Sequence, residues 1–195
     1  MDKQTPVSGG SMKSDLTIRQ ARVGDEAKVQ AFGRALWFEQ GVEPAPYVSG
    51  VFAKYWNETY LRMTFTMPEC GFIVAEQNNV IVGIAAANVK SNEPKTALLS
   101  RLWVLPSHHG RDIERALLKR CERALPRTVR NLLTSVAQCD ESALHFYAAE
   151  GFNAVRLIEL GEGEHRNVFV EMTKPIERSV MFTICASPQT AASLN

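Results

Sequence analysis

The stretch RLWVLPSHHGRDIERALLKRCERAL, residues 101–125, passes from an apolar strand through Pro106 and a basic turn into a helix. Apolar residues after the turn recur at helical spacing on one face, with charged residues opposite. The first N–H groups of such a helix have no partner within the helix, and they carry a partial positive charge. Because Gly110 frees the backbone of the turn, these donors can hold a phosphate or pyrophosphate. The stretch therefore predicts a strand-to-helix junction with an anion site.

The composition is that of an ordinary globular protein. Of the 195 residues, 45% are hydrophobic and 22% are charged, and the formal net charge is +1. A charge this close to zero gives no electrostatic basis for binding nucleic acid or a membrane surface. No apolar run approaches the roughly 20 residues that span a bilayer, and the N-terminus lacks an apolar signal segment. We expect a cytoplasmic protein whose partners include neither nucleic acid nor a membrane.

The residues that commonly bind metals form no recognisable ligand pattern. The four cysteines are scattered without C-x-x-C spacing, and the four histidines complete no metal motif with them. We expect reduced thiols and no metal site.

Hydrophobic periodicity predicts about seven strands and four helices. Strands are expected at 16–21, 71–76, 80–89, 96–106, 128–137, 151–160 and 167–173, and helices from about 25 to 36 and at 48–66, 111–125 and 141–149. The sequence QNN (77–79) is typical of a hairpin turn, and the helix that joins 96–106 to 128–137 makes those two strands parallel. This order predicts a single mixed, mostly antiparallel sheet flanked by helices on both faces, in the α/β or α+β class.

Two tails flank the predicted domain, which covers residues 15–176. Residues 1–14 are rich in Ser, Gly, Thr and Pro, which predicts disorder. Residues 177–195 contain VMFTIC, an apolar segment that can add an edge strand. Pairing of this edge strand with its copy in a second chain would give a homodimer.

Two motifs of this chain are similar to signatures of one family. In DESALHFYAAEGF (140–152), five residues fall on N-x-x-A-x-x-F-Y-x-x-x-G-F, the second signature of the GNAT acetyltransferase superfamily: Ala143, Phe146, Tyr147, Gly151 and Phe152. Residues 101–125 likewise resemble its coenzyme motif, L-x-V-x-P-x-x-Q/R-G-x-G-x-G/A followed by R-A-L-L. The matching positions there are Leu102, Val104, Pro106, Gly110, Ile113, Arg115, Ala116, Leu117 and Leu118. The resemblance covers about residues 15–176 and implies a GNAT-like fold.

The resemblance also implies an N-acetyltransferase with acetyl-CoA as its co-substrate. Backbone groups of β-strand residues would pair with the pantetheine arm, and the amides of the loop that follows would hold the pyrophosphate. Those strand residues are Leu102, Trp103 and Val104, and the loop residues are Gly110, Arg111, Asp112, Ile113, Glu114 and Arg115, with Asp140 at the start of the second motif beside them. Tyr147 would be the general acid that protonates the leaving thiolate, because the pKa of a phenol lies near that of a thiol. The amine would attack the thioester directly, without a covalent enzyme intermediate.

Three acidic residues depart from the family pattern. Asp112 and Glu114 replace the two later glycines of the loop, and Asp140 stands where asparagine is usual. A carboxylate about 6 Å from a phosphate charge costs about 0.7–2.8 kcal/mol for effective dielectrics of about 80 down to 20. Acidic residues at a helix start also act as caps and dipole partners with no ligand present. A catalytically inactive GNAT-fold binding or regulatory protein, with a weakened coenzyme A site, is therefore the alternative.

A general base for the acceptor amine is not evident in the two strands where the family often carries a glutamate. Strands 96–104 and 128–137 contain no carboxylate. His108 and His109 are candidates because histidine titrates near neutral pH, although adjacent histidines in a turn are also common as solvated residues. Glu39 is a third candidate, and an amine with a low pKa would need no strong base.

The resemblance implies that the acceptor, expected to be a small-molecule amine, is held by the first helix pair and the last two strands, here residues 35–47, 51–56 and 159–166. The residues singled out there are Trp37, Phe38, Glu39 and Tyr47. Aromatic faces and carboxylates together suit a cationic amine. The alternative is that the aromatic residues of this region, Tyr55 and Trp56 included, form the core under the helices.

Overall fold

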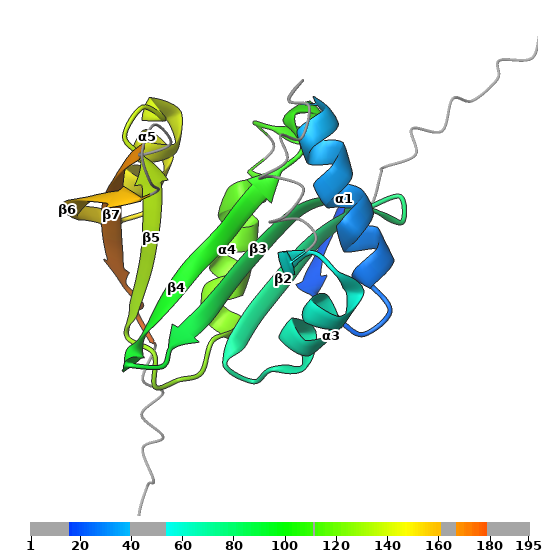
Figure 1. Cartoon of the computed structure of the whole chain (residues 1–195), viewed down its shortest axis with the longest axis horizontal. Helices are drawn as coiled ribbons and strands as arrows, with labels where there is room; N and C mark the ends of the chain where they lie inside the picture. Colours follow the sequence, from blue (N-terminus) through cyan, green and yellow to red (C-terminus); the bar gives the residue numbers. More distant parts are fainter. Residues whose placement is uncertain (1–15, 40–53, 111, 161–166, 179–195) are drawn as a thin grey trace, which may run out of the picture.

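The computed structural model describes residues 16–39, 54–110, 112–160 and 167–178. These residues form one seven-stranded sheet with helices on both faces (Figure 1). The strands are β1 (Leu16–Gln20), β2 (Cys70–Gln77), β3 (Val80–Lys90), β4 (Glu93–Val104), β5 (Asn131–Ala137), β6 (Asn153–Leu160) and β7 (Asn167–Pro175). The helices are α1 (Glu26–Glu39), α3 (Glu58–Thr66), α4 (Ile113–Ala124) and α5 (Glu141–Ala149), with a 3-10 helix, η1 (Pro106–His108), after β4. The predicted fold class is confirmed.

The strand order is β1-β2-β3-β4-β5-β7-β6, and every neighbouring pair is antiparallel except β4 and β5. The parallel pair is the one that the helical crossover predicted. At the predicted hairpin, Asn78 and Asn79 have φ of 51° and 66°. Two left-handed residues in succession make the turn whose twist matches antiparallel strands, and asparagine tolerates this conformation better than most residues.

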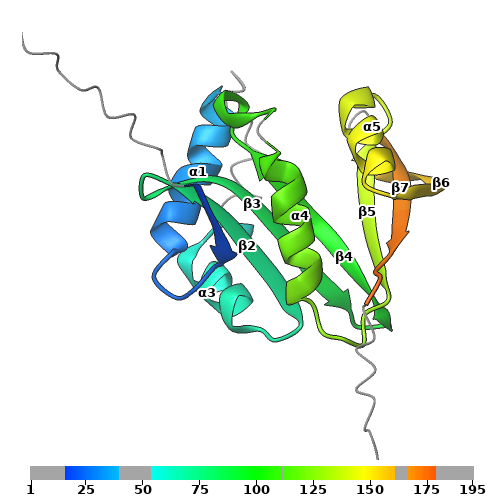
Figure 2. The same cartoon turned by 180° about the vertical axis from the view of Figure 1, so that it is seen from behind.

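Helices α1 and α3 cover one face of the first four strands, and α4 covers the other (Figures 1 and 2). Helix α4 is amphipathic as predicted, and it buries Ile113, Leu117, Leu118 and Cys121. Close packing shows at Gly83 in β3, where a Cβ atom would lie 3.0 Å from both the Leu117 and the Val104 side chains. Val104 and α4 therefore share one face of the sheet.

One predicted helix, at 48–66, is wrong as a single element. Residues 48–53 lie outside the described residues, 54–55 are helical, and the chain bends at Trp56 and Asn57 before α3 begins. The Asn57 side chain accepts a hydrogen bond from the Tyr60 backbone N–H at 2.8 Å, which caps the new helix. Apolar periodicity continues across the bend, so the helix appeared continuous from spacing alone.

The structure does not test the predictions for the two tails. Residues 1–14 and 179–195 lie outside the described residues, and the chain is not strand at 176–178. Within the part of the chain that is described, no helix is long and apolar enough to cross a membrane.

Strands β4 and β5 pair over only three residue pairs, Thr96↔Asn131, Ala97↔Leu132 and Leu98↔Leu133. Beyond Leu98 the strands separate, so the sheet opens into a V (Figures 1 and 2). Strand β5 then pairs with β7, β7 pairs with β6, and α5 covers this second half. The gap between the halves is where the candidate site lies.

An ion network joins β1, β2 and the start of α1. Arg19 contacts both oxygens of the buried Asp25 carboxylate at 2.6 and 2.8 Å, and it donates to Glu76 at 2.8 Å. Lys28 reaches the other oxygen of Glu76 at 2.6 Å. The hydrogen bond from Arg19 lowers the pKa of Asp25, and those from Lys28 and then Arg19 lower the pKa of Glu76. Carboxylates with depressed folded-state pKa values stabilise the fold above their ordinary pKa, and this stabilisation is lost as pH falls through the folded-state values.

We predict that Asp25→Asn lowers the free energy of unfolding by about 2–3 kcal/mol near neutral pH, because it removes the more buried of the two carboxylates that Arg19 contacts. The difference from the native chain should shrink as the pH of urea denaturation is lowered to about 3, where the native carboxylate also becomes protonated. Glu93→Gln is the matched control, since it removes an exposed pair with Lys90 and should leave stability unchanged. A difference that does not change with pH would contradict the assigned role.

Candidate active site

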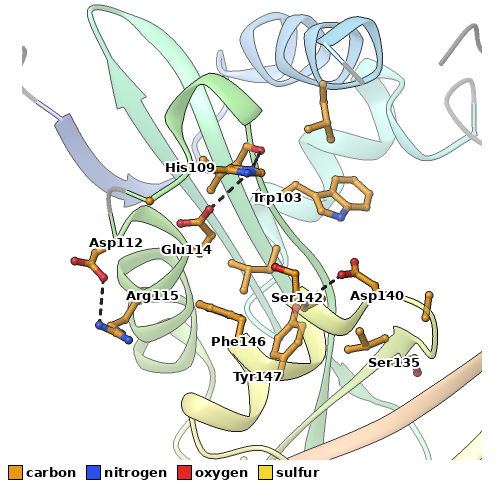
Figure 3. A pocket seen from close by; sticks show the side chains of 17 residues that line it. Trp103, His109, Asp112, Glu114, Arg115, Ser135, Asp140, Ser142, Phe146 and Tyr147 are labelled. Atoms are coloured by element: carbon orange, nitrogen blue, oxygen red, sulfur yellow. Dashed lines mark hydrogen bonds and ion pairs between the residues drawn. The ribbon is translucent and has the colours of Figure 1, made fainter. Parts of the chain in front are cut away.

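A cavity of about 710 Å³ occupies the gap between β4 and β5. Figure 3 shows Trp103 on one side of it and Phe146 and Tyr147 of α5 on the other. Leu36 of α1 also lines the cavity, so the cavity reaches from the α5 side of the sheet toward α1. The remaining lining residues are Leu102, Val104, His109, Gly110, Asp112, Glu114, Arg115, Ser135, Val136, Ala137, Asp140, Ser142 and Ala143.

The β4 wall of the cavity is the part of β4 that does not pair with β5. Leu102, Trp103 and Val104 all line the cavity, and all three come after the last residue that pairs with β5, Leu98. The backbone N–H and C=O groups on the edge of β4 from which β5 has separated need another hydrogen-bond partner. An extended, amide-containing ligand can fill that role as an added strand does. One such group is already engaged, because His109 Nε2 donates to the Val104 carbonyl at 3.0 Å.

The loop before α4 enters the helix through two left-handed residues. Gly110 has a φ of 74°, and Asp112 has a φ of 56° with a ψ of 17°. Nothing lies within 4 Å of a Cβ atom built on Gly110, so the need for glycine there comes from backbone conformation and not from crowding. The Asp112 carbonyl accepts from Ala116 N at 3.0 Å and starts the helix. Ile113 is fully buried, which fixes the helix start against the sheet.

Tyr147 is a buried phenol at the inner end of the cavity. Only 9% of the residue is exposed, and its ring packs edge-on against Phe152 at 5.1 Å between ring centres. Burial raises the pKa of Tyr147 to about 12, although a hydrogen bond with the Thr134 side chain acts in the opposite direction. Tyr147 is therefore a neutral phenol throughout the physiological range. A neutral phenol in a nearly dry site can donate a proton to an anion that forms beside it.

Three features of this site agree with a comparison of the sequence with known families. They are the unpaired β4 edge, the left-handed glycine before a helix, and the phenol across the gap. The profile of the Acetyltransferase (GNAT) family matches residues 35–152. The chain belongs to this family. No curated protein is similar enough to match it.

Solved GNAT structures share the fold. The Thermoplasma acidophilum PaiA N-acetyltransferase in complex with coenzyme A has a TM-score of 0.65 and 17% identity, over 83% of this chain and 99% of that one. A GNAT acetyltransferase from Streptococcus pneumoniae has a TM-score of 0.65 and 20% identity, over 83% and 100%. Arabidopsis thaliana Naa50, in complex with the bisubstrate analogue CoA-Ac-MVNAL, has a TM-score of 0.59 and 19% identity, over 82% and 97%.

Coenzyme A is bound in the PaiA structure and a coenzyme A bisubstrate analogue in the Naa50 structure, which supports acetyl-CoA as the co-substrate expected for a member of this family. The residues present fit such a ligand, because the cavity combines an open strand edge with the N-terminus of a 12-residue helix. The strand edge suits the amides of a pantetheine arm, and the helix N-terminus suits its phosphates. Among the described residues, no group of three or more His, Cys, Asp and Glu side chains is placed to hold a metal ion.

The GNAT loop of this chain contains its own ion pairs. Arg115 contacts Glu150 through Nε at 2.6 Å and Asp112 through Nη1 at 3.2 Å, and Glu150 raises the pKa of Arg115. Glu114 lies 3.9 Å from His109 Nε2 at the rim of the cavity (Figure 3). A phosphate at this loop would share Arg115 with two carboxylates. Arg111, the other basic residue assigned to the loop, lies outside the described residues.

The acidic residues at the starts of α4 and α5 have different roles. Asp140 caps α5, since its side chain accepts from Ala143 N at 2.9 Å, and it also lines the cavity. Asp112 is at the cap position of α4 but makes no side-chain capping bond, so the expectation that it caps this helix is wrong. Its left-handed backbone explains why the family motif has glycine at this position. Glu114 lies in the first turn of α4, where an acidic side chain favours the helix dipole.

Of the three candidate bases, the structure brings one to the cavity. His109 lines it, with 58% of its side chain exposed. His108 is held elsewhere, between Gln77 and Ser107, each at 3.0 Å. Glu39 ends α1, and its side chain lies outside the described residues.

The side chains of the expected acceptor residues lie outside the part of the chain that the structure describes. Trp37 and Phe38 belong to the last turn of α1, but only their backbone is described, and Tyr47 lies outside the described residues. Trp56 is 2% exposed and stacks on Phe32 at 6.4 Å, so its core alternative is confirmed.

Sequence reasoning missed Arg101, on the α1 side of β4, and the contacts that connect it through Trp56 to Trp103. Trp103 stacks on Trp56 with ring centres 5.8 Å apart and an interplanar angle of 6°. The Arg101 guanidinium lies over the same Trp56 ring at 5.4 Å. Alternation along β4 could have indicated that Arg101 and Trp103 share a face, but Trp56 comes from a distant part of the chain.

We predict that Asp112→Gly raises the free energy of unfolding by about 0.5–1 kcal/mol, because glycine adopts the left-handed conformation without the Cβ penalty. Asp112→Asn is the matched control, since it removes the charge but keeps a residue that tolerates this conformation. It should leave stability nearly unchanged in the same denaturant titration. A loss of stability in Asp112→Gly would show that the aspartate side chain supports the loop.

Proposed function

We propose that this protein is an N-acetyltransferase that moves the acetyl group of acetyl-CoA to a small-molecule amine, with Tyr147 as general acid. The observation that carries the proposal is the position of a buried, neutral phenol in the cavity that β4 and β5 form where they separate. A thioester bound along the β4 edge would bring its sulfur into this cavity.

The proposed reaction is a direct transfer. The amine nitrogen attacks the thioester carbonyl carbon, the C–S bond breaks, and the Tyr147 hydroxyl proton passes to the departing thiolate. The nitrogen loses one proton to solvent, and solvent returns a proton to Tyr147. The protons balance without a covalent enzyme intermediate, and the dry environment of the phenol strengthens its interaction with the thiolate.

His109 is the proposed outlet for the amine proton. Its Nε2 donates to the Val104 carbonyl, so Nε2 carries a hydrogen and Nδ1 remains able to accept a proton. The ring is exposed at the rim of the cavity and can pass that proton to water. An amine that arrives uncharged needs no stronger base.

The coenzyme contacts are part of the same proposal. Leu102, Trp103 and Val104 would pair with the pantetheine amides, and the loop from Gly110 to Arg115 would hold the pyrophosphate. Asp140 would act by fixing the start of α5, whose side chains form the opposite wall. Trp37, Phe38, Glu39 and Tyr47 remain the proposed acceptor residues, because they belong to or follow the helix that contributes Leu36 to the cavity.

An inactive binding or regulatory role is the second candidate. The observation that favours it is the carboxylate pair that already neutralises Arg115, together with Glu114 at the cavity rim. Such a loop can be stable without a phosphate. The two candidates differ in whether acetyl transfer occurs at all.

We predict that Tyr147→Phe lowers kcat for acetyl transfer by about 100-fold or more, because general acid catalysis typically contributes 10²–10⁴-fold. Release of free coenzyme A thiol with a panel of small amines measures the rate, and acetyl-CoA affinity should be unchanged. Since the pKa of Tyr147 is about 12, native kcat should not decline near pH 10, where an ordinary tyrosine ionises.

Ser142→Ala is the control for this variant, since it removes a different hydroxyl from the cavity lining. It should retain the native rate. Equal rates in Tyr147→Phe and the native protein would exclude Tyr147 as the acid. Acetyl-CoA binding with no turnover of any amine by the native protein would favour the inactive candidate.

A further inference from the structure

Arg101 is a half-buried cation on the α1 side of β4. Its guanidinium lies 5.4 Å from the centre of the Trp56 ring, and it interacts with the Tyr60 side chain. Burial lowers the pKa of Arg101 from its ordinary value, with Tyr60 acting in the opposite direction. The surroundings are thus aromatic and poorly hydrated. Aromatic rings suit a guanidinium, but the described part of these surroundings contains no opposite charge.

Among the described residues, no carboxylate lies within 4 Å of Arg101 to form an ion pair. Several other arginines of the fold do have a carboxylate partner. Arg19 contacts Asp25 at 2.6 Å, Arg115 contacts Glu150 at 2.6 Å, and Arg156 contacts Glu171 at 2.9 Å. These three are paired although Arg115 and Arg156 are half exposed or more. A desolvated cation without an anion is costly, and bound anions commonly occupy such positions.

The position of Arg101 connects it to the cavity. Trp103 lines the cavity and lies two residues further along β4, about 6.6 Å away and on the same face of the strand. Trp56 contacts both residues, since its ring stacks on Trp103 and lies under the Arg101 guanidinium. Leu36 of α1 lines the cavity as well, so the cavity extends toward the face on which Arg101 lies.

We propose that Arg101 binds a carboxylate of the acceptor, so that the acceptor carries an amine and a carboxylate in one molecule. This inference rests on the proposed function and specifies its substrate class. A guanidinium presents parallel N–H donors that match the two oxygens of a carboxylate. The amine end would extend past Trp103 to the thioester, and the carboxylate would supply a negative charge that the described residues do not place beside Arg101. Trp103 would cover the carbon chain between the two groups.

The test compares carboxylates with their matched amides. The probes are the N-acetyl derivatives of glycine, 4-aminobutyrate and 6-aminohexanoate, with the carboxamide of each, which mimic products of different length. Binding is followed by the fluorescence of the tryptophans and requires no turnover. We expect at least one carboxylate to bind about ten- to a hundredfold more tightly than its amide, since charged hydrogen bonds have this effect.

Arg101→Met should abolish the preference for the carboxylate over the amide, because it keeps an apolar stem of similar length without the charge. Arg101→Lys should retain part of the preference, since an ammonium cannot bind in a bidentate manner. Lys54→Met is the matched control, since it removes an exposed cation 5.1 Å from the Tyr55 ring in the same region, and the preference should persist. If Arg101→Met does not fold, the preference for the carboxylate over the amide is measured in Arg101→Lys and Arg101→Gln.

Two results would overturn the proposal: native protein that binds no carboxylate in preference to its amide, or a preference that survives in the folded Arg101 variants. The proposed function is measured separately. Acetylation of the free amino acids, compared with their amides, should show the same preference in kcat/KM. If Arg101-dependent carboxylate binding occurs without acetylation of any amine, the carboxylate site stands and the transferase proposal fails.

Discussion

The separation of β4 from β5 after three residue pairs is the constraint on which the site depends. A fully paired sheet would place hydrogen bonds where the cavity now lies. Because the strands part, the β4 edge from Leu102 to Val104, the start of α4 and the Tyr147 ring all border one space of about 710 Å³. The rest of the sheet holds this geometry, with α4 buried against β2–β4 and α5 over the second half. The opening is thus built into the sheet and does not depend on a loop.

The two sides of this opening differ in chemistry. On the α4 side, the helix N-terminus favours phosphates. Asp112, Glu114 and Glu150 oppose them, and Asp112 and Glu150 also occupy Arg115. On the α1 side, Trp56 and Trp103 form an apolar surface beside the guanidinium of Arg101, which has no carboxylate partner among the described residues. A reaction between a coenzyme thioester and an amine needs two approaches to one point. In the proposed reaction, the parted strands would supply both approaches, one from each face of the sheet.

Local sequence predicted much of this arrangement. Alternation and turn residues identified all seven strands, the hairpin at Asn78 and Asn79, and the parallel pair, because each depends on near neighbours or on simple connection rules. The motifs pointed to Gly110 and Tyr147, which both line the cavity. The failures involve other causes: Asn57 interrupts an apolar pattern, Asp112 adopts a left-handed backbone, and Arg115 pairs with Glu150 across 35 residues. Arg101 was missed because local sequence does not show that, among the described residues, the folded chain places no carboxylate beside it.

The most direct test of the account is isothermal titration of the protein with acetyl-CoA, beside a variant in which the cavity is filled. Ala143→Trp places an indole on the α5 wall, where the native residue lines the cavity and is half-buried. We predict one site per chain in the native protein, with a Kd on the order of micromolar to tens of micromolar, and loss of binding in the folded variant. No binding by the native protein up to millimolar acetyl-CoA, or equal affinity in Ala143→Trp, would contradict the claim that the parted strands hold the coenzyme.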